Sequence, residues 1–326
     1  MDPQAIASVS ALLAEVARAD GDRPLSDHLW LDLVNQGVNQ GVNRGVNGGR
    51  DGFVGVIARD DRDDDKPDDD ELVPIAYAQA SRANASWTLE LVVAPSHRGD
   101  LCAIGTDLIG AALGVIGAEG GGRVDWWVFS PSPAHDELAA TIGLRPGRRL
   151  SQLRRPLPTA ERPEIETRAF VPGADEDAWL TVNNRAFESH REQGGWDRET
   201  LLMREREPWF DPAGFLLHER DGRIAGFCWT KLHTDHEPPL GEIYVIAVDP
   251  DFHGQGLGKQ LTLAGLDSIA RRGVSIAMLY VDTDNTAGLR LYEGLGFTVH
   301  RTDRAYVGDI ANSVDDTANP GATEAP

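Results

Sequence analysis

Cysteine and positive charge are scarce in this 326-residue sequence, and each shortage excludes a class of protein. The two cysteines, Cys102 and Cys228, are too few and too far apart for a disulfide framework or a zinc site, which indicates a reducing compartment. Lysine and arginine number 31 against 52 acidic residues, a formal net charge of −21. Such a surface repels nucleic acid backbones and anionic lipid headgroups, so we expect neither as a partner.

A secretory signal is also lacking, because 1–20 has no basic start followed by an apolar run. We therefore expect a cytoplasmic protein. One apolar run, 101–118, is as long as a membrane span. Its Asp107 and its high share of glycine and alanine favour a buried helix instead.

The length of the chain suits two domains of roughly 150 residues each. The Arg-Pro-Leu-Pro run at 155–158 has few backbone donors and resists helix formation, which indicates an interdomain linker. We therefore expect a first domain over 1–157, a second over 158–309, and a disordered tail over 310–326, which is rich in polar residues, glycine and proline.

Two segments of the first domain have the composition of insertions without a core of their own. The first, 35–50, repeats Gly-Val-Asn, and asparagine and glycine at that density favour turns. The second, 60–71, holds nine acids against Arg62 and Lys66, so it cannot bury apolar area. We expect both to be solvated and assign neither a function.

Apolar runs bounded by turn residues recur in the same order in the two halves. In the first half the pattern predicts strands over 53–59, 74–82, 87–93 and 124–129, and helices over 102–118 and 133–142. In the second half it predicts strands over 215–219, 224–232, 241–248 and 276–281, a helix after the glycines near 256, and a helix over 285–295. The repeated order indicates the duplication of one α/β domain, with helices around a mixed sheet.

The run VDPDFHGQGLG at 248–258 is the strongest local signal for chemistry. A buried strand ends at Pro250, and a loop with glycine at 254, 256 and 258 leads directly into a helix. The first N–H groups of a helix have no partner within it, so this turn can bind a pyrophosphate. Rossmann and P-loop proteins use related turns, but this sequence lacks the Gly-Lys-Ser/Thr ending and the later acidic residue that those motifs require.

A second run, 284–297, surrounds the later helix with Asn285, Ala287, Tyr292 and a closing Gly-Phe pair. Together with 248–258, this array resembles the GNAT superfamily of N-acetyltransferases, over Phe215 to Val307. The resemblance implies two tandem GNAT domains, the second of them catalytic, with acetyl-CoA as co-substrate.

The first half resembles the same fold in a degenerate form. Leu91, Val92 and Val93 occupy the place of the cofactor strand, but 99–105 lacks the regular glycine spacing, and 134–142 has neither the tyrosine nor the asparagine of the second run. This half could hold acetyl-CoA without reacting it, or only wall the substrate site.

Within the superfamily, the tandem arrangement and five short segments resemble a branch that acetylates the cysteinyl amine of cysteinyl-glucosaminyl-inositol. These segments are 182–187, 192–196, 209–212, 229–233 and 241–245. The resemblance implies a small-molecule amino-sugar thiol as acceptor. We also expect a monomer. Two alternatives stay open: a GNAT enzyme acting on another amine, such as a protein N-terminus or an antibiotic, and a non-catalytic acyl-CoA-binding module.

Two side chains are candidates for the proton transfers. A primary amine is mostly protonated near neutral pH, so acetyl transfer needs a base, and Glu242 on the 241–248 strand is our candidate. On an alternating strand it shares a face with Tyr244 and Ile246. The departing thiolate needs a proton, which Tyr292 can donate from two helical turns beyond Asn285. The plainer alternatives are an exposed carboxylate at a strand start and a core tyrosine.

The remaining site residues are implied by the resemblance. Substrate contacts fall on Asp27, Glu192, Lys231, Glu242 and Tyr280. Cofactor contacts fall on Ile246, Ala247, Val248, His253, Gly254, Gln255, Gly256, Leu257, Gly258, Lys259, Asn285, Thr286, Ala287, Gly288, Leu289 and Arg290, and in the first half on Leu91, Val92 and Val93. Asn285 could equally cap its helix, and Asp27 could be a helix N-terminal charge. His233 and His236 have no third ligand at a useful spacing, so we expect no metal.

Overall fold

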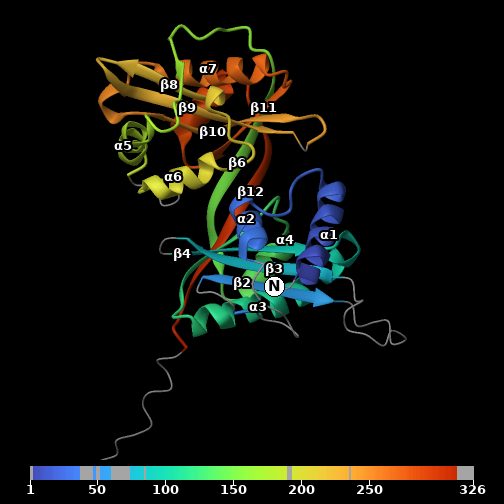
Figure 1. Cartoon of the computed structure of the whole chain (residues 1–326). Helices are drawn as coiled ribbons and strands as arrows, with labels where there is room; N and C mark the ends of the chain where they lie inside the picture. The colour runs from blue at the N-terminus through green and yellow to red at the C-terminus, as the bar shows by residue number, and fades with distance from the viewer. Residues whose placement is uncertain are drawn as a thin grey trace, which may run out of the picture. The chain divides into compact units, whose positions relative to one another are not determined.

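The computed structural model describes residues 3–36, 47–48, 52–59, 74–83, 86–188, 193–234 and 236–313. The chain forms two compact units, one of Met1–Arg149 with Thr302–Pro326 and the other of Leu150–Arg301 (Figure 1). The expected insertion 60–71 lies outside the described residues, as does most of 35–50, of which Asn47–Gly48 form the strand β1.

The first unit is a layer of strands covered on both faces by helices. Its strands lie in the order β1, β2 (Phe53–Arg59), β3 (Pro74–Ala83), β4 (Ser86–Val93), β5 (Gly122–Val128) and β12 (Thr298–Ile310). Helices α1 (Pro3–Asp20) and α2 (Asp27–Gln36) pack on one face, and α3 (Leu101–Ala118) and α4 (Pro133–Thr141) on the other (Figure 1).

The apolar run 101–118 forms α3, whose Leu108, Ile109, Ala112 and Ile116 are buried in the core of the first unit. The expected helix is therefore confirmed. By length and composition alone, the stretch Pro95–Ala118 would also suffice to cross a membrane.

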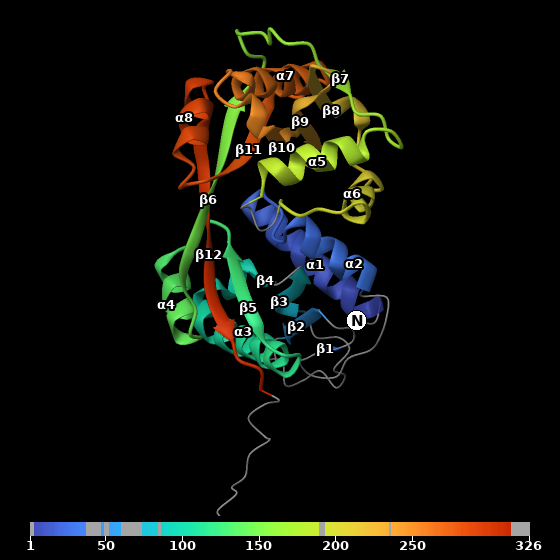
Figure 2. The same ribbon diagram turned by 90° about the vertical axis from the view of Figure 1, so that its left-hand side faces the viewer.

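The second unit repeats this plan. Its strands lie in the order β6 (Arg145–Pro156), β11 (Ile276–Asp282), β10 (Leu240–Val248), β9 (Arg223–His233), β8 (Phe215–Arg220) and β7 (Arg168–Ala169). Figure 2 shows α7 (Leu257–Arg271) and α5 (Glu176–Ala186) on opposite faces of β9 and β10. The shorter helices α6 (Arg198–Glu205) and α8 (Thr286–Gly294) complete the unit.

Each unit has one parallel strand pair, β4 with β5 and β10 with β11, among antiparallel neighbours. The expected α/β fold with a mixed sheet is therefore confirmed, and the expected strands and helices are present with ends shifted by one or two residues. Strands with alternating or continuous apolar residues form where the pattern predicts them, because that pattern is what a half-buried or buried strand requires.

The units divide the chain differently from the expected boundary at 157–158. Strand β6 continues through Pro156, which pairs with Ile276 of β11, so part of the expected linker belongs to the second unit's sheet. Proline has no backbone N–H to donate to a neighbouring strand, and β6 ends at this residue. At the other end, Arg304–Ile310 of β12 pair with β5 and complete the first unit. Ile310, expected to begin the tail, is thus the last residue of a strand, and 314–326 lie outside the described residues.

Candidate active site

The site is built where β10 leaves its parallel partner. β11 pairs with β10 only over Leu240–Ile243, whereas β9 stays paired with β10 as far as Val248. A register shift between Ile243 and Val245 marks a β-bulge at this point. A bulge bends and twists its strand, so within this described stretch the backbone of Ile246–Val248 leaves the β11 ladder and can bond a ligand.

The bulge also changes which side chains share a face. Tyr244 and Ala247 pack against the aromatic cluster under α5, whereas Ile246 and Val248 pack against the aliphatic core under α7. The expected shared face of Glu242, Tyr244 and Ile246 therefore does not hold for Ile246. One extra residue in the strand inverts the alternation beyond it.

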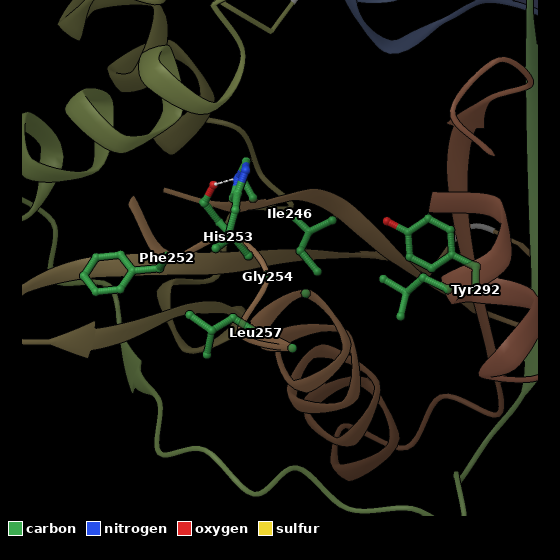
Figure 3. Close-up of a pocket in the computed structure, with 11 residues that line it drawn as sticks. Ile246, Phe252, His253, Gly254, Leu257 and Tyr292 are labelled. Atoms are coloured by element: carbon green, nitrogen blue, oxygen red, sulfur yellow. Dashed lines mark hydrogen bonds between the residues drawn. The ribbon is translucent and has the colours of Figure 1, made fainter. Parts of the chain in front are cut away.

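An open pocket of about 300 Å³ lies beside this diverging strand (Figure 3). Its lining combines the end of β10, the glycine loop, the first turn of α7 and the facing side of α8: Ile246, Ala247, Val248, Phe252, His253, Gly254, Gly256, Leu257, Gly258, Leu291 and Tyr292. Most of the residues expected at the cofactor from this strand and loop are brought together here. Gln255, Lys259 and the expected run from Asn285 to Arg290 do not line it.

The glycine loop leaves the start of α7 without a side-chain cap. Gly254 and Gly256 have φ angles of 74° and 75°, a region that L-residues with a Cβ rarely adopt. Gly256 is the N-cap of α7, and no side chain accepts a hydrogen bond there. A Cβ added at either glycine would meet nothing within 4 Å, so the space above these amides is open. The loop therefore fits a pyrophosphate at the helix N-terminus.

The start of α8 differs, because its own N-cap already uses it. The Asn285 side-chain oxygen accepts a hydrogen bond from the Gly288 N–H at 2.9 Å. Asn285 thus has the capping role that the sequence left open, and α7 is the better site for an anion.

An ion-pair network anchors the loop to α5. Arg185 donates to Asp249 at 2.9 Å and to Asp251 at 3.0 Å, and Arg223 reaches the other oxygen of Asp251 at 2.9 Å. Asp249 is buried, and its carboxylate also accepts the Asp251 N–H at 3.0 Å. These contacts tie the chain just before the glycines to α5 and to the start of β9.

Tyr292 contributes a buried hydroxyl to the pocket. Its ring packs against Phe297, with centroids 5.8 Å apart, and in Figure 3 the hydroxyl points toward Ile246. Burial raises the pKa of Tyr292 to about 12. The hydroxyl is therefore protonated near neutral pH and can donate.

Glu242 is a buried carboxylate with a histidine partner. Its Oε2 lies 2.7 Å from Nε2 of His233, and both side chains are about one-tenth exposed. Burial raises the pKa of Glu242, but the hydrogen bond from His233 and the charges of His233 and Lys231 outweigh burial and hold it below its ordinary value. The group is thus ionised and able to accept a proton. The reading of Glu242 as an exposed carboxylate at a strand start is wrong.

Of the other expected substrate residues, Lys231 lies beside Glu242 and Tyr280 lies on the neighbouring strand β11. Lys231 pairs with Glu242 across β9 and β10, and its Nζ lies 4.6 Å from the ring centre of Trp209. Tyr280 accepts a hydrogen bond from Gln152 Nε2 at 2.7 Å. Asp27 begins α2 in the first unit, but its side chain lies outside the described part of the chain, as does all of Glu192.

The corresponding segment of the first unit has a different turn. After Leu91–Val93, the chain enters a short 3₁₀ helix, Pro95–Asp100, in place of a left-handed glycine loop. Arg98 in that turn forms a two-bond ion pair with Asp20 of α1, at 2.9 and 2.7 Å.

Three residues at the site were missed from the sequence: His233, Phe252 and Leu291. His233 shares strand parity with Lys231, so pairing β9 with the Glu242 strand would have indicated it. Phe252 and Leu291 are apolar and carry no chemical signal in the sequence.

Comparisons with known proteins identify the family and the fold. The sequence model of the Acetyltransferase (GNAT) family matches residues 182–297. A GCN5-related N-acetyltransferase from Sphaerobacter thermophilus superposes with a TM-score of 0.68 at 25% identity, over 95% of this chain and 94% of its own. A tandem GNAT protein from the clavulanic acid biosynthesis pathway has the same fold, with a TM-score of 0.66 at 15% identity, over 96% of this chain and 97% of its own. The fold and the site define a tandem GNAT acetyltransferase.

Closer relatives narrow this class. The mycothiol acetyltransferase of Thermobispora bispora is 43% identical over 92% of this chain and 94% of its own length. That of Acidimicrobium ferrooxidans is 42% identical over 90% of this chain and 91% of its own. The chain belongs to the mycothiol acetyltransferase family.

Proposed function

We propose that this enzyme transfers the acetyl group of acetyl-CoA to the cysteinyl amine of cysteinyl-glucosaminyl-inositol, giving mycothiol and CoA. The observation that carries the proposal is a buried, ionised Glu242 on the same strand as the open amides beside the α7 pocket. Membership of the family supplies the acceptor, and the geometry supplies a base, an acid and an anion site.

The second unit would bind acetyl-CoA at two places. The uncapped first turn of α7 and the glycines before it would bond the pyrophosphate. The backbone of Ile246–Val248, released from β11, would bond the pantetheine arm and the thioester oxygen, where negative charge develops.

The proton transfers fall to two side chains. Glu242 accepts a proton from the acceptor ammonium, and the freed nitrogen attacks the thioester carbon. When the tetrahedral intermediate collapses, Tyr292 donates its proton to the departing thiolate and regains one from the new amide nitrogen. One proton leaves through Glu242 to solvent, so each turnover yields an amide, a thiol and one proton.

Lys231 and Tyr280 complete the proposed acceptor site. Lys231, buried against the Trp209 ring, places a positive charge near the amine and favours its neutral form. The Tyr280 hydroxyl can bond a sugar or inositol hydroxyl. The enzyme would act as a monomer in the reducing cytoplasm, where its thiol product stays reduced.

The test uses the full chain, acetyl-CoA and cysteinyl-glucosaminyl-inositol. Product is followed by mass spectrometry, because the free thiol of the acceptor interferes with reagents that detect CoA. Resistance of the acetyl product to hydroxylamine shows an amide in place of a thioester. Glucosaminyl-inositol and a peptide with an N-terminal cysteine are the comparison acceptors. If only the peptide is acetylated, the proposed acceptor is wrong. If acetyl-CoA binds but no amine is acetylated, the protein is a non-catalytic acyl-CoA-binding module.

A further inference from the structure

His233 has no assigned part in the reaction, yet it makes a short polar contact with the proposed base. It lies at the end of β9, diagonally across from Glu242 of β10, and its side chain is 9% exposed. The contact joins Nε2 to Oε2 at 2.7 Å, a short distance typical of a charge-assisted bond. A carboxylate can only accept, so with Glu242 ionised the Nε2–H must donate.

This hydrogen bond stabilises the ionised form of Glu242 more than the neighbouring charges do. On β9, Lys231 faces Glu242, and on β10 Tyr244 lies two residues beyond it, with its hydroxyl accepting from Arg204 of α6 at 3.3 Å. The negative charge of Glu207, which follows α6, raises the pKa of Tyr244.

On β11 and α7, within the part of the chain that the structure describes, apolar side chains lie next to Glu242. On β11 its pairing partner is Met278, and at Gly241 the α7 side is filled by Ile269. The ring of His236 meets that of His233 edge to face, with centroids 5.7 Å apart.

We propose that His233 is a positioning residue for acetyl transfer, whose Nε2–H fixes one oxygen of Glu242 and keeps the carboxyl ionised, so that the other oxygen faces the acceptor amine. The inference rests on the proposed role of Glu242 as base. In the step itself, an N–H bond of the ammonium breaks, its electron pair stays on nitrogen, and the proton joins Oε1. Oε2 keeps the bond from His233 throughout.

The expected effect follows from the balance of burial and bonding at Glu242. Burial raises the pKa of this carboxyl, and the hydrogen bond from His233 is the largest opposing influence. Without it, burial prevails and the pKa of Glu242 rises. A side chain that merely filled space would leave this pKa unchanged.

Two amide variants separate the bond from the ring. In His233→Gln, the amide nitrogen stands where Nε2 stood and can still donate to Glu242. In His233→Asn, the shorter side chain reaches only the Nδ1 position and loses the bond. The matched control is His218→Gln, which alters another buried histidine of the second unit, one that contacts the Glu166 backbone oxygen through Nδ1 at 2.8 Å.

The experiment titrates Glu242 directly in each full-length variant, using the ¹³C resonance of its carboxyl carbon, assigned by its loss in Glu242→Gln. In His233→Asn we expect the midpoint to rise. His233→Gln should shift by less, and His218→Gln should not shift. In the same variants kcat should fall toward low pH in parallel with the titration, with KM for acetyl-CoA unchanged. Thermal unfolding and acetyl-CoA binding confirm folding. If the Asn variant does not fold, His233→Ala, which also removes the donor, is titrated in its place.

The outcomes separate this inference from the function on which it rests. An unshifted midpoint in the Asn variant overturns the role of His233, even if Glu242→Gln is inactive. If Glu242→Gln retains full activity, the base assignment fails and the role of His233 fails with it.

Discussion

Replacing Gly256 by alanine tests whether the first turn of α7 binds the phosphates of acetyl-CoA. The substitution adds no clash, because a Cβ there would meet nothing within 4 Å. It does add strain, since φ at this position is 75° and a left-handed conformation costs an L-residue about 1–2 kcal/mol. We expect the loop backbone to rotate to relieve that strain, which would move the N–H groups that face the pocket.

Gly273, just beyond the other end of α7, is the matched control. Its φ is 83°, and a Cβ there also meets nothing within 4 Å. Gly273→Ala and Gly256→Ala should therefore lose similar stability, about 1 kcal/mol each, seen as a fall in Tm of about 2–4 °C. Only Gly256 lies in the pocket lining.

The two variants should differ in their affinity for acetyl-CoA. A hydrogen bond to a charged group contributes about 1.5–3 kcal/mol, so misplacing one amide raises Kd about ten- to hundredfold. Isothermal titration calorimetry on both variants measures this directly. Equal affinities in the two variants, whether both unchanged or both weakened, would refute the pyrophosphate site at α7.

Three further variants test the chemistry and the stability. Tyr292→Phe keeps the ring and should lower kcat about a hundredfold without weakening acetyl-CoA binding. With an acetyl thioester of a more acidic thiol, the same substitution should lower kcat by a smaller factor, because that thiolate leaves without needing a proton. An equal fall in kcat with both thioesters would exclude the acid role. Glu242→Gln should lower kcat/KM for the acceptor by about 10²- to 10⁴-fold, and because the pKa of Glu242 is held below its ordinary value, the wild type should lose this base only as pH falls through that low pKa. Glu90 in β4 accepts the Ser26 N–H at 2.8 Å, and burial raises its pKa to about 7, so wild-type stability should fall by up to about 3 kcal/mol as pH rises from about 4.5 through 7. Urea unfolding of Glu90→Gln at both ends of this pH range should show a free energy of unfolding that no longer falls by this amount. A fall as large as in the wild type would contradict the assignment to Glu90.

The local backbone conformation of the site could be predicted from the sequence because it depends on neighbours along the chain. Glycine at 254 and 256 indicated a left-handed turn into a helix, and the structure has both residues at positive φ at the start of α7. Asp249-Pro250 indicated the end of a strand by the same kind of reasoning. The repeated order of apolar runs predicted the mixed sheet in each half.

The pairings between distant segments could not be predicted in the same way. Nothing near Arg304 indicates that it will pair with Val128, because strand partners are chosen by the three-dimensional packing of whole elements. The linker expected at 155–158 was inferred from proline content, and the strand that ends at Pro156 was overlooked for that reason.

The sequence by itself determined the class of fold and the glycine turn at the N-terminus of α7, and it supplied Glu242 and Tyr292 as candidates for proton transfer. Each of these depends on residue type and short-range spacing. Only the tertiary structure decided that a bulge separates Ile246 from the face of Tyr244 and that His233 meets Glu242 in a buried bond. The physical reason is that a shift of one residue between paired strands reverses every side chain beyond it, and that register is set by packing across the sheet.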